Sequence, residues 1–239
     1  MNTGTDVTTA ATPYGRAALV AASVVAGALA VPPHPVATPL CAAAFGLFAL
    51  FGLFVWRWSR LPLVRLAASG GMSRLVRPAI CIGAGLGVGL LILAVMRIVI
   101  EPAVPAIASR IAAAGALPVW RRVAIIYVAA VGEELIFRLF LLSAVAGVAA
   151  RLFAHSRDAP APAAVWTAIS LSALLFAAAH LPSWSGLSSG VVVPLLVMAL
   201  NAAGGIVLGY VFATRGIVAA MWVHAGADCA IQLIGPLTG

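Results

Sequence analysis

Charged residues are scarce in this sequence, and lysine is absent altogether. Only 8% of the 239 residues are charged, whereas 64% are hydrophobic. A soluble globular domain usually carries about 25% charged residues. This shortage of polar surface excludes an ordinary soluble domain and indicates a chain that lipid covers over much of its surface.

Acidic residues are scarcer than basic ones, 6 against 14, which gives a formal net charge of +8. A basic chain can bind nucleic acid, but these arginines stand singly or in short clusters at the ends of apolar runs. This distribution is typical of membrane topology signals and of contact with anionic lipid headgroups. We therefore expect the lipid bilayer as a partner, and no nucleic acid.

Cysteine is also rare. Cys41, Cys81 and Cys229 form no CxxC pair, and each lies in or beside an apolar run. Such residues usually behave as small buried hydrophobic side chains. Neither a disulfide framework nor a cysteine metal site is expected.

Long apolar runs, by contrast, follow one another along the chain. A membrane-spanning helix needs about 20 mostly apolar residues. The pattern predicts an all-α, polytopic transmembrane helix bundle of about seven spans, at 17–31, 36–56, 78–100, 123–150, 164–181, 191–213 and 217–236. The first run is short and ends near a signal-peptidase-like Ala28-Leu29-Ala30. We expect it to remain as an uncleaved helix, because only Arg16 precedes it and many spans follow.

The segment 101–122 is ambiguous, because three prolines interrupt it and Arg110 lies in its middle. It can lie in the interface, re-enter the bilayer, or cross it as an eighth span. The arginine-rich loop 57–77 favours a cytoplasmic position. If this loop is cytoplasmic and 101–122 does not cross the membrane, the loops at 151–163 and at 215 are also cytoplasmic. If 101–122 does cross, every later loop lies on the opposite side of the membrane.

The first polar cluster inside an apolar run consists of Glu133, Glu134 and Arg138. On a helix, Glu134 and Arg138 share one face at the i,i+4 spacing, with Glu first, which favours an ion pair. Glu133 points about 100° away from Glu134. We therefore expect Arg138 to neutralise Glu134 and leave Glu133 free as a general base. A purely structural ion-pair network is the alternative.

Two further clusters lie in later apolar runs, Phe176 with His180 and His224 with Asp228. Both pairs have the i,i+4 spacing and so share a helix face. Ionisable side chains inside a span are costly and are functional candidates by default. Asp228 can hold the His224 ring in one tautomer, or both can face one ligand.

The three clusters read EELIFR, FAAAH and HAGAD, in this order. They resemble the three signature motifs, EExxxR, FxxxH and HxxxD or HxxxN, of the CPBP family of CAAX proteases and bacteriocin-processing enzymes. The resemblance covers about residues 120–235. It implies a CPBP-like catalytic helical core at 120–239. The segment 17–119, before this core, is expected to hold N-terminal transmembrane helices and an interfacial segment. Residues 1–16 are expected to form a polar tail.

The resemblance also implies roles for the residues. Glu133 would activate the attacking water and His180 would help to hold it, with Glu134, Arg138 and Phe176 in support. His224 and Asp228 would stabilise the oxyanion. The family's last position is more often Asn. An ionised Asp228 is a poor hydrogen-bond donor, so it must be protonated in that role or orient His224 instead.

Two versions of the hydrolysis remain open. In the preferred one, Glu133 alone activates the water and no cofactor is required. In the other, His180, His224 and Glu133 bind Zn²⁺, which activates the water as in metalloproteases. The chain has no HExxH motif.

The resulting expectation is an intramembrane endopeptidase of a prokaryotic plasma membrane, acting on a peptide or protein that is lipidated or not. The main alternative is non-enzymatic, a membrane scaffold or bacteriocin-immunity protein that binds a peptide or a membrane partner. A proton-coupled transporter ranks last, because the sequence has no convincing internal repeat.

Overall fold

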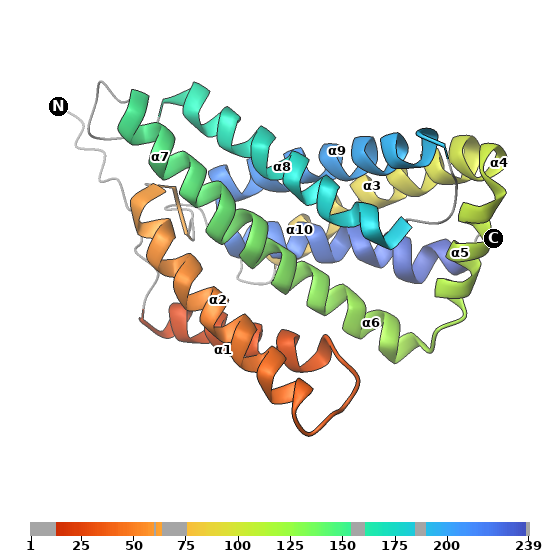
Figure 1. The fold of residues 1–239 in the computed structure, drawn as a ribbon, viewed down its shortest axis with the longest axis horizontal. Helices are drawn as coiled ribbons and strands as arrows, with labels where there is room; N and C mark the ends of the chain where they lie inside the picture. Colours follow the sequence, from red (N-terminus) through yellow and green to blue (C-terminus); the bar gives the residue numbers. More distant parts are fainter. Residues whose placement is uncertain (1–12, 60, 64–75, 154–160, 185–189, 238–239) are drawn as a thin grey trace.

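The computed structural model of the protein describes residues 13–59, 61–63, 76–153, 161–184 and 190–237. These residues form helices and short connections, with no strand among them, arranged as one bundle (Figure 1). In chain order the helices are α1 (Pro13–Leu29), α2 (Ala37–Ser59), α3 (Val76–Val95), η1 (Met96–Ile100), α4 (Glu101–Ala103), α5 (Pro105–Gly115), α6 (Val119–Val128), η2 (Ala129–Leu142), α7 (Ser143–Phe153), α8 (Pro162–Trp184), α9 (Val192–Arg215), α10 (Ile217–Cys229), η3 (Ala230–Ile234) and η4 (Gly235–Leu237).

The predicted polytopic helical bundle is confirmed. Six helical stretches among the described residues are long and apolar enough to cross a membrane, and the shorter Tyr14–Leu29 stands where the first span was predicted. The six are Ala37–Ser59, Val76–Ile100, Val119–Leu152, Pro162–Trp184, Val192–Arg215 and Ile217–Leu237. Many large aliphatic side chains on their outer faces are exposed, as contact with lipid requires. Residues 1–12 of the predicted polar tail lie outside the described residues, and its last four residues already belong to α1.

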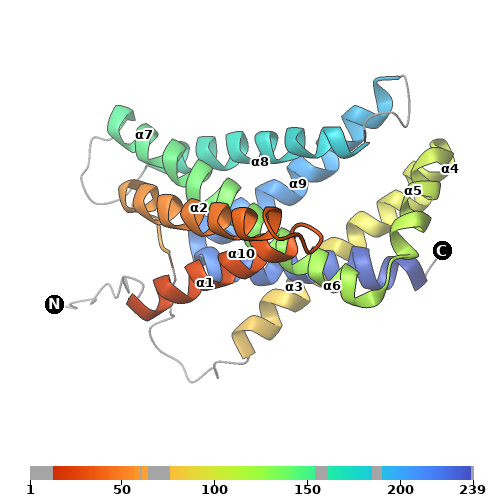
Figure 2. The same ribbon diagram turned by 60° about the horizontal axis from the view of Figure 1, so that its bottom comes forward.

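The ambiguous segment 101–122 does not form a span. It contains α4, α5 and the first turn of α6. An eleven-residue helix such as α5 is only about 16 Å long, about half of the hydrocarbon thickness. Figures 1 and 2 show α4 and α5 together at one end of the bundle, near the C-terminus.

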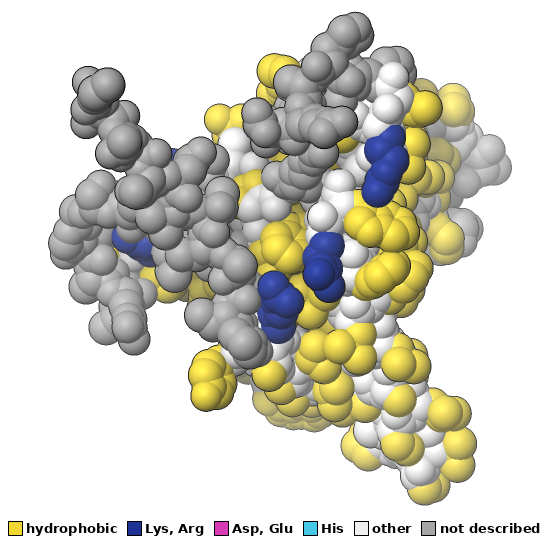
Figure 3. All heavy atoms as spheres, turned by 90° about the vertical axis from the view of Figure 1, so that its left-hand side faces the viewer, with side chains coloured by type: hydrophobic (Ala, Val, Ile, Leu, Met, Phe, Trp, Pro, Cys, Tyr) yellow, Lys and Arg dark blue, Asp and Glu magenta, His cyan; other side chains and the backbone are white. Residues whose placement is uncertain are grey.

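The helices run up and down, so the bundle has two ends. We call one the basic end. It holds the end of α2, the starts of α3 and α8, the end of α7 and the turn between α9 and α10. Figure 3 looks onto this end and shows arginine but no acidic side chain on its described surface. The described arginines at this end are Arg16, Arg57, Arg77, Arg151 and Arg215.

The opposite end holds α4, α5, the start of α6, the end of α8 and the segment η3–η4. A cluster of buried apolar residues joins α5 to η1 and α9 there, through Ile100, Ile107, Val193 and Val197. The larger apolar core connects α2, η2, α8, α9 and α10, with Leu53, Leu135, Leu139, Ile169, Phe212 and Ile217 among its members.

Glycines let α3 and α10 approach closely. A Cβ atom at Gly85 would collide with the backbone of Val223, and one at Gly226 would collide with the backbone of Ile82. Gly89 meets α10 one turn further along, at Ala227. Small residues at a helix interface permit this backbone contact in membranes. This packing fixes the position of α10 along α3. Helix α10 carries His224 and Asp228.

Candidate active site

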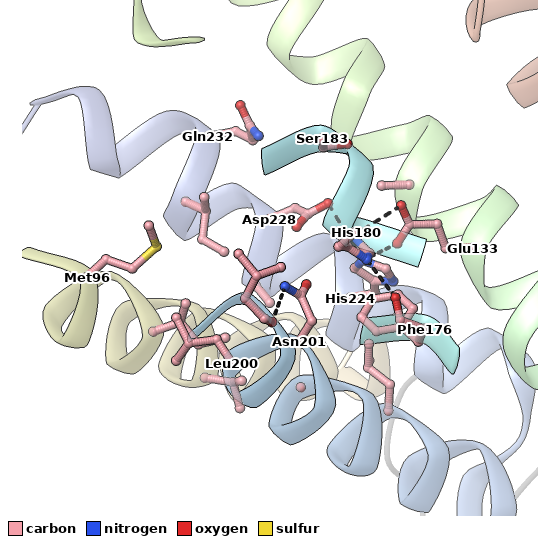
Figure 4. Close-up of a pocket in the computed structure, with 18 of the residues that line it drawn as sticks. Met96, Glu133, Phe176, His180, Ser183, Leu200, Asn201, His224, Asp228 and Gln232 are labelled. Atoms are coloured by element: carbon pink, nitrogen blue, oxygen red, sulfur yellow. Dashed lines mark hydrogen bonds and ion pairs between the residues drawn. The ribbon is translucent and has the colours of Figure 1, made fainter. Parts of the chain in front are cut away.

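Three helices bring the predicted site residues together. The segment η2 carries Glu133, Glu134 and Arg138, and is wound with the i→i+5 hydrogen bonds of a π-helix, a form often found at functional sites. Helix α8 carries Phe176 and His180, and α10 carries His224 and Asp228. Figure 4 shows Glu133 and Asp228 approaching the two imidazole rings from opposite sides.

Glu134 and Arg138 form a completely buried ion pair. The guanidinium Nη1 lies 3.1 Å from Oε1 of Glu134, and both side chains are 0% exposed. Arg138 also donates from Nη2 to the carbonyl of Gly205, 3.3 Å away, and its Cζ lies 4.5 Å from the ring centre of Phe176. The pair therefore connects η2 with α8 and α9 in the middle of the bundle.

The ring of His224 is held by Glu134. Its Nδ1 lies 2.9 Å from Glu134 Oε1, and because a carboxylate accepts, Nδ1 carries the donated proton. Its Nε2 faces Oε2 of Glu133 at 3.7 Å and Oδ2 of Asp228 at 3.8 Å. The residue that orients His224 is thus Glu134, on another helix, and not the neighbour four positions along α10.

The ring of His180 is held by its own helix. Its Nδ1 lies 2.8 Å from the carbonyl oxygen of Phe176. A carbonyl only accepts, so in the neutral ring Nδ1 bears the hydrogen and Nε2 keeps its lone pair. That Nε2 lies 3.9 Å from Oε1 of Glu133. Two polar atoms at this distance are too far apart for a direct hydrogen bond and leave room for a bridging water.

Glu133, His180, His224 and Asp228 all line one cavity of about 600 Å³. Glu133 is 31% exposed there, in contrast to the adjacent Glu134. The cavity extends past the cluster toward the end of the bundle opposite the basic end. Its wall also includes polar residues that the motifs do not contain: Arg110, Ser183, Asn201 and Gln232. Asn201 and Gln232 each place an amide inside an apolar run, which is the signal by which the sequence could have identified them.

Two arginines anchor the helical turns that follow Asp228. Arg97, which is paired with Glu101 at 2.8 Å, donates from Nη2 to the carbonyl of Gly235 at 2.9 Å. Arg122 donates to the carbonyl of Gln232 at 2.8 Å. Cations near the carbonyl end of a helix are favourable. These contacts hold the far end of the α10–η3 helix.

The alternative metal ligands His180, His224 and Glu133 lie on the wall of the cavity. Each histidine uses Nδ1 in a hydrogen bond, to Phe176 and to Glu134, and turns Nε2 toward Glu133. Within the described ranges no three His, Cys, Asp or Glu side chains make a group that could hold a metal ion.

The protein is a bundle of helices able to cross a membrane, and an acid–base cluster lies on the wall of its cavity. This combination is that of an integral membrane protein with a polar site among its membrane-spanning helices. Residues 115–230, about half of the chain, match the family model described as Type II CAAX prenyl endopeptidase Rce1-like. The matched segment includes η2, α8 and α10. The chain belongs to the CAAX protease family, as its motifs predicted, and is a membrane protease of the CAAX endopeptidase type. No curated protein and no solved structure matches it.

Proposed function

We propose that the chain hydrolyses a peptide bond inside the membrane with a water molecule that Glu133 activates. The observation that supports this is the 3.9 Å separation of Glu133 Oε1 and His180 Nε2. A water between them would donate one O–H to each atom at ordinary distances. Its lone pair would then be free to attack a carbonyl carbon in the cavity.

In the proposed reaction Glu133 takes a proton from the water as the water oxygen bonds to the carbonyl carbon. The π electrons of the C=O bond move onto the carbonyl oxygen, which becomes the oxyanion. When the tetrahedral intermediate collapses, the C–N bond breaks and Glu133 returns the proton to the leaving nitrogen. A carboxyl group and an amine are formed, and Glu133 is restored.

His224 is the proposed donor to the oxyanion. Its Nδ1–H is used by Glu134, so Nε2–H must serve, and the ring must act as an imidazolium. The carboxylates around it supply negative charge that stabilises this cation. Asp228 can add a second donor in its protonated form, and in its ionised form it helps to hold the imidazolium.

Purified wild-type protein is expected to cleave at least one member of a panel of hydrophobic and prenylated peptides. Aliphatic residues such as Ile92, Met96 and Leu196 line much of the cavity, which suits such substrates. The cleavage is expected to persist after exhaustive chelation, because Glu133 needs no metal to take a proton. Mass spectrometry of the products, before and after chelation, measures the cleavage and its persistence without metal. Activity that chelation abolishes and Zn²⁺ restores would assign water activation to a metal. Binding without any cleavage would favour the membrane scaffold.

We further infer that the active-site cavity opens toward the extracytoplasmic side. In the sequence, nine of the 14 arginines lie in or beside the stretches that adjoin the helix ends at the basic end, and basic connections are retained in the cytoplasm. Of the four arginines at the opposite end, Arg97 and Arg122 are engaged with backbone carbonyls inside the protein, and Arg110 and Arg121 are exposed. The cavity reaches that end, because Ser183 and Trp184, at the end of α8, line it. The proposed substrate is then a peptide presented from outside the cytoplasm.

Reporter fusions test this orientation. Alkaline phosphatase fused after Gly239 is expected to be active in a bacterial host, since that enzyme folds only after export. Green fluorescent protein at the same position is expected to stay dark, whereas the same reporter before residue 1 is expected to fluoresce. A bright fusion after Gly239 with an inactive phosphatase would reverse the orientation and place the cavity mouth in the cytoplasm.

A further inference from the structure

Arg110 is the one arginine among the described residues that line the active-site cavity. It lies on α5, outside the segments that carry the three motifs. The other charged or titratable side chains of the wall, Glu133, Asp228 and the two histidines, belong to the acid–base cluster. The cavity therefore has a second polar feature of opposite sign to its carboxylates.

An aromatic ring holds Arg110 at the cavity. Its Cζ lies 5.2 Å from the ring centre of Trp184, a cation–π contact. Ile107 of α5 is buried in the apolar cluster with Val193 of α9, so α5 is fixed in place beside this ring. Trp184 follows His180 by four residues on α8, which places it about 6 Å further along the helix. Arg110 and the acid–base cluster thus line the same cavity, with Trp184 between them along α8.

Other arginines at or near the site have oxygen acceptors, and Arg110 differs from them. Arg97 and Arg138 each contact a carboxylate and donate a hydrogen bond to a backbone carbonyl. Arg122 donates a hydrogen bond to a backbone carbonyl. In the part of the chain that the structure describes, Arg110 has only the Trp184 ring as a partner. A guanidinium stacked on an aromatic face keeps its N–H donors free at the edge.

We propose that Arg110 and Trp184 form an anion-binding subsite of the cavity, which takes a carboxylate or phosphate group in the same cavity as the bond that is cleaved. Arginine binds both groups with paired, charge-assisted hydrogen bonds. The ligand is either a carboxylate of the substrate peptide or the phosphate of a lipid headgroup. An extended peptide advances about 3.3–3.6 Å per residue, so the position at which a peptide carboxylate reaches Arg110 reports how far the subsite lies from the scissile bond. The peptide version rests on the proposed function, whereas the anion subsite itself does not.

Binding measurements on a protein that cannot cleave test the anion subsite separately from the proposed peptidase function. In the Glu133→Gln background, in nanodiscs of phosphatidylcholine, we would measure the affinity of peptide pairs that differ only in carboxylate against carboxamide. The carboxylate is placed at successive positions, from an acidic side chain or a free C-terminus. Arg110→Gln removes the cation, and Arg121→Gln is the matched control, because Arg121 is exposed at the same end but does not line the cavity.

The carboxylate peptide is expected to bind about ten-fold more tightly than its carboxamide at one position in the series. Arg110→Gln is expected to abolish that preference, and Arg121→Gln to retain it. Anionic phosphatidylglycerol that competes with the peptide only when Arg110 is present would identify a lipid phosphate as a ligand of the same subsite. Equal affinities for both peptides in every position, without such competition, would overturn the subsite. So would a preference that survives Arg110→Gln.

Discussion

Glu133→Gln is expected to lower the rate of peptide cleavage by about 10²–10⁴-fold, the usual contribution of a general base, and to leave folding unchanged. Glutamine has nearly the same size, but it cannot take a proton from the water. The side chain of Glu133 faces the cavity and makes no direct hydrogen bond to a described residue. Little stability should therefore depend on its charge. Single-turnover cleavage and the melting temperature in detergent measure the two effects.

Glu101→Gln is the control for that experiment, because it makes the same chemical change at a carboxylate paired with Arg97 and outside the cavity wall. It is expected to cleave at close to the wild-type rate. His224→Ala, which removes the proposed oxyanion donor, is expected to lose activity as Glu133→Gln does. If Glu133→Gln cleaved at the wild-type rate, Glu133 would have no part in the mechanism. If the Glu133→Gln protein failed to fold, the cluster would have a structural role.

The same substitution one residue later is expected to act on stability. Glu134→Gln removes the counter-charge of Arg138 at a site where both side chains are 0% exposed. Breaking a buried ion pair by neutralising one partner costs about 3–5 kcal/mol. We therefore expect a large fall in the melting temperature or failure to accumulate in membranes, and a loss of activity through misplacement of His224. Thermal melts and membrane yield measure the effect.

A compensating variant keeps this prediction testable. Glu134→Gln with Arg138→Met removes both charges of the pair and so avoids the cost of leaving the Arg138 charge buried without its partner. The double variant is expected to recover most of the melting temperature without recovering activity, because a neutral amide at position 134 no longer offers His224 a charged acceptor. If Glu134→Gln alone melts like wild type, the pair does not stabilise the fold.

Much of the bundle could be predicted, because its polar residues stand out against apolar runs. The predicted run 123–150 corresponds to the long helix Val119–Leu152. Helical spacing was enough to separate Glu133 from the Glu134–Arg138 pair, although η2 is wound as a π-helix and not as the α-helix that the prediction assumed. Local spacing carries such information within one helix, since it fixes which side chains share a face.

Contacts between helices could not be predicted in this way. The hydrogen bond from His224 to Glu134 joins residues 90 positions apart. Spacing suggested only that Asp228 could hold the ring or face one ligand together with it. Arg110 also went unrecognised, because its neighbour Trp184 lies far away in the sequence. The course of 101–122 remained open since its prolines allow several paths; in the structure, Pro105 begins α5 after the break at Val104.

The separation of these partners along the chain also has a meaning for synthesis. A ribosome delivers Glu133, Glu134 and Arg138 to the membrane about 90 residues before His224, which at about 5–20 residues per second is several seconds. During that interval the i,i+4 pairing lets Arg138 neutralise Glu134 within its own helix, so the nascent span needs no outside partner for these charges. Glu133 meanwhile lacks His224 and Asp228. The growing chain thus carries a neutralised helix but an incomplete acid–base cluster, and the protein acquires the full set of these groups only after α10 has been made.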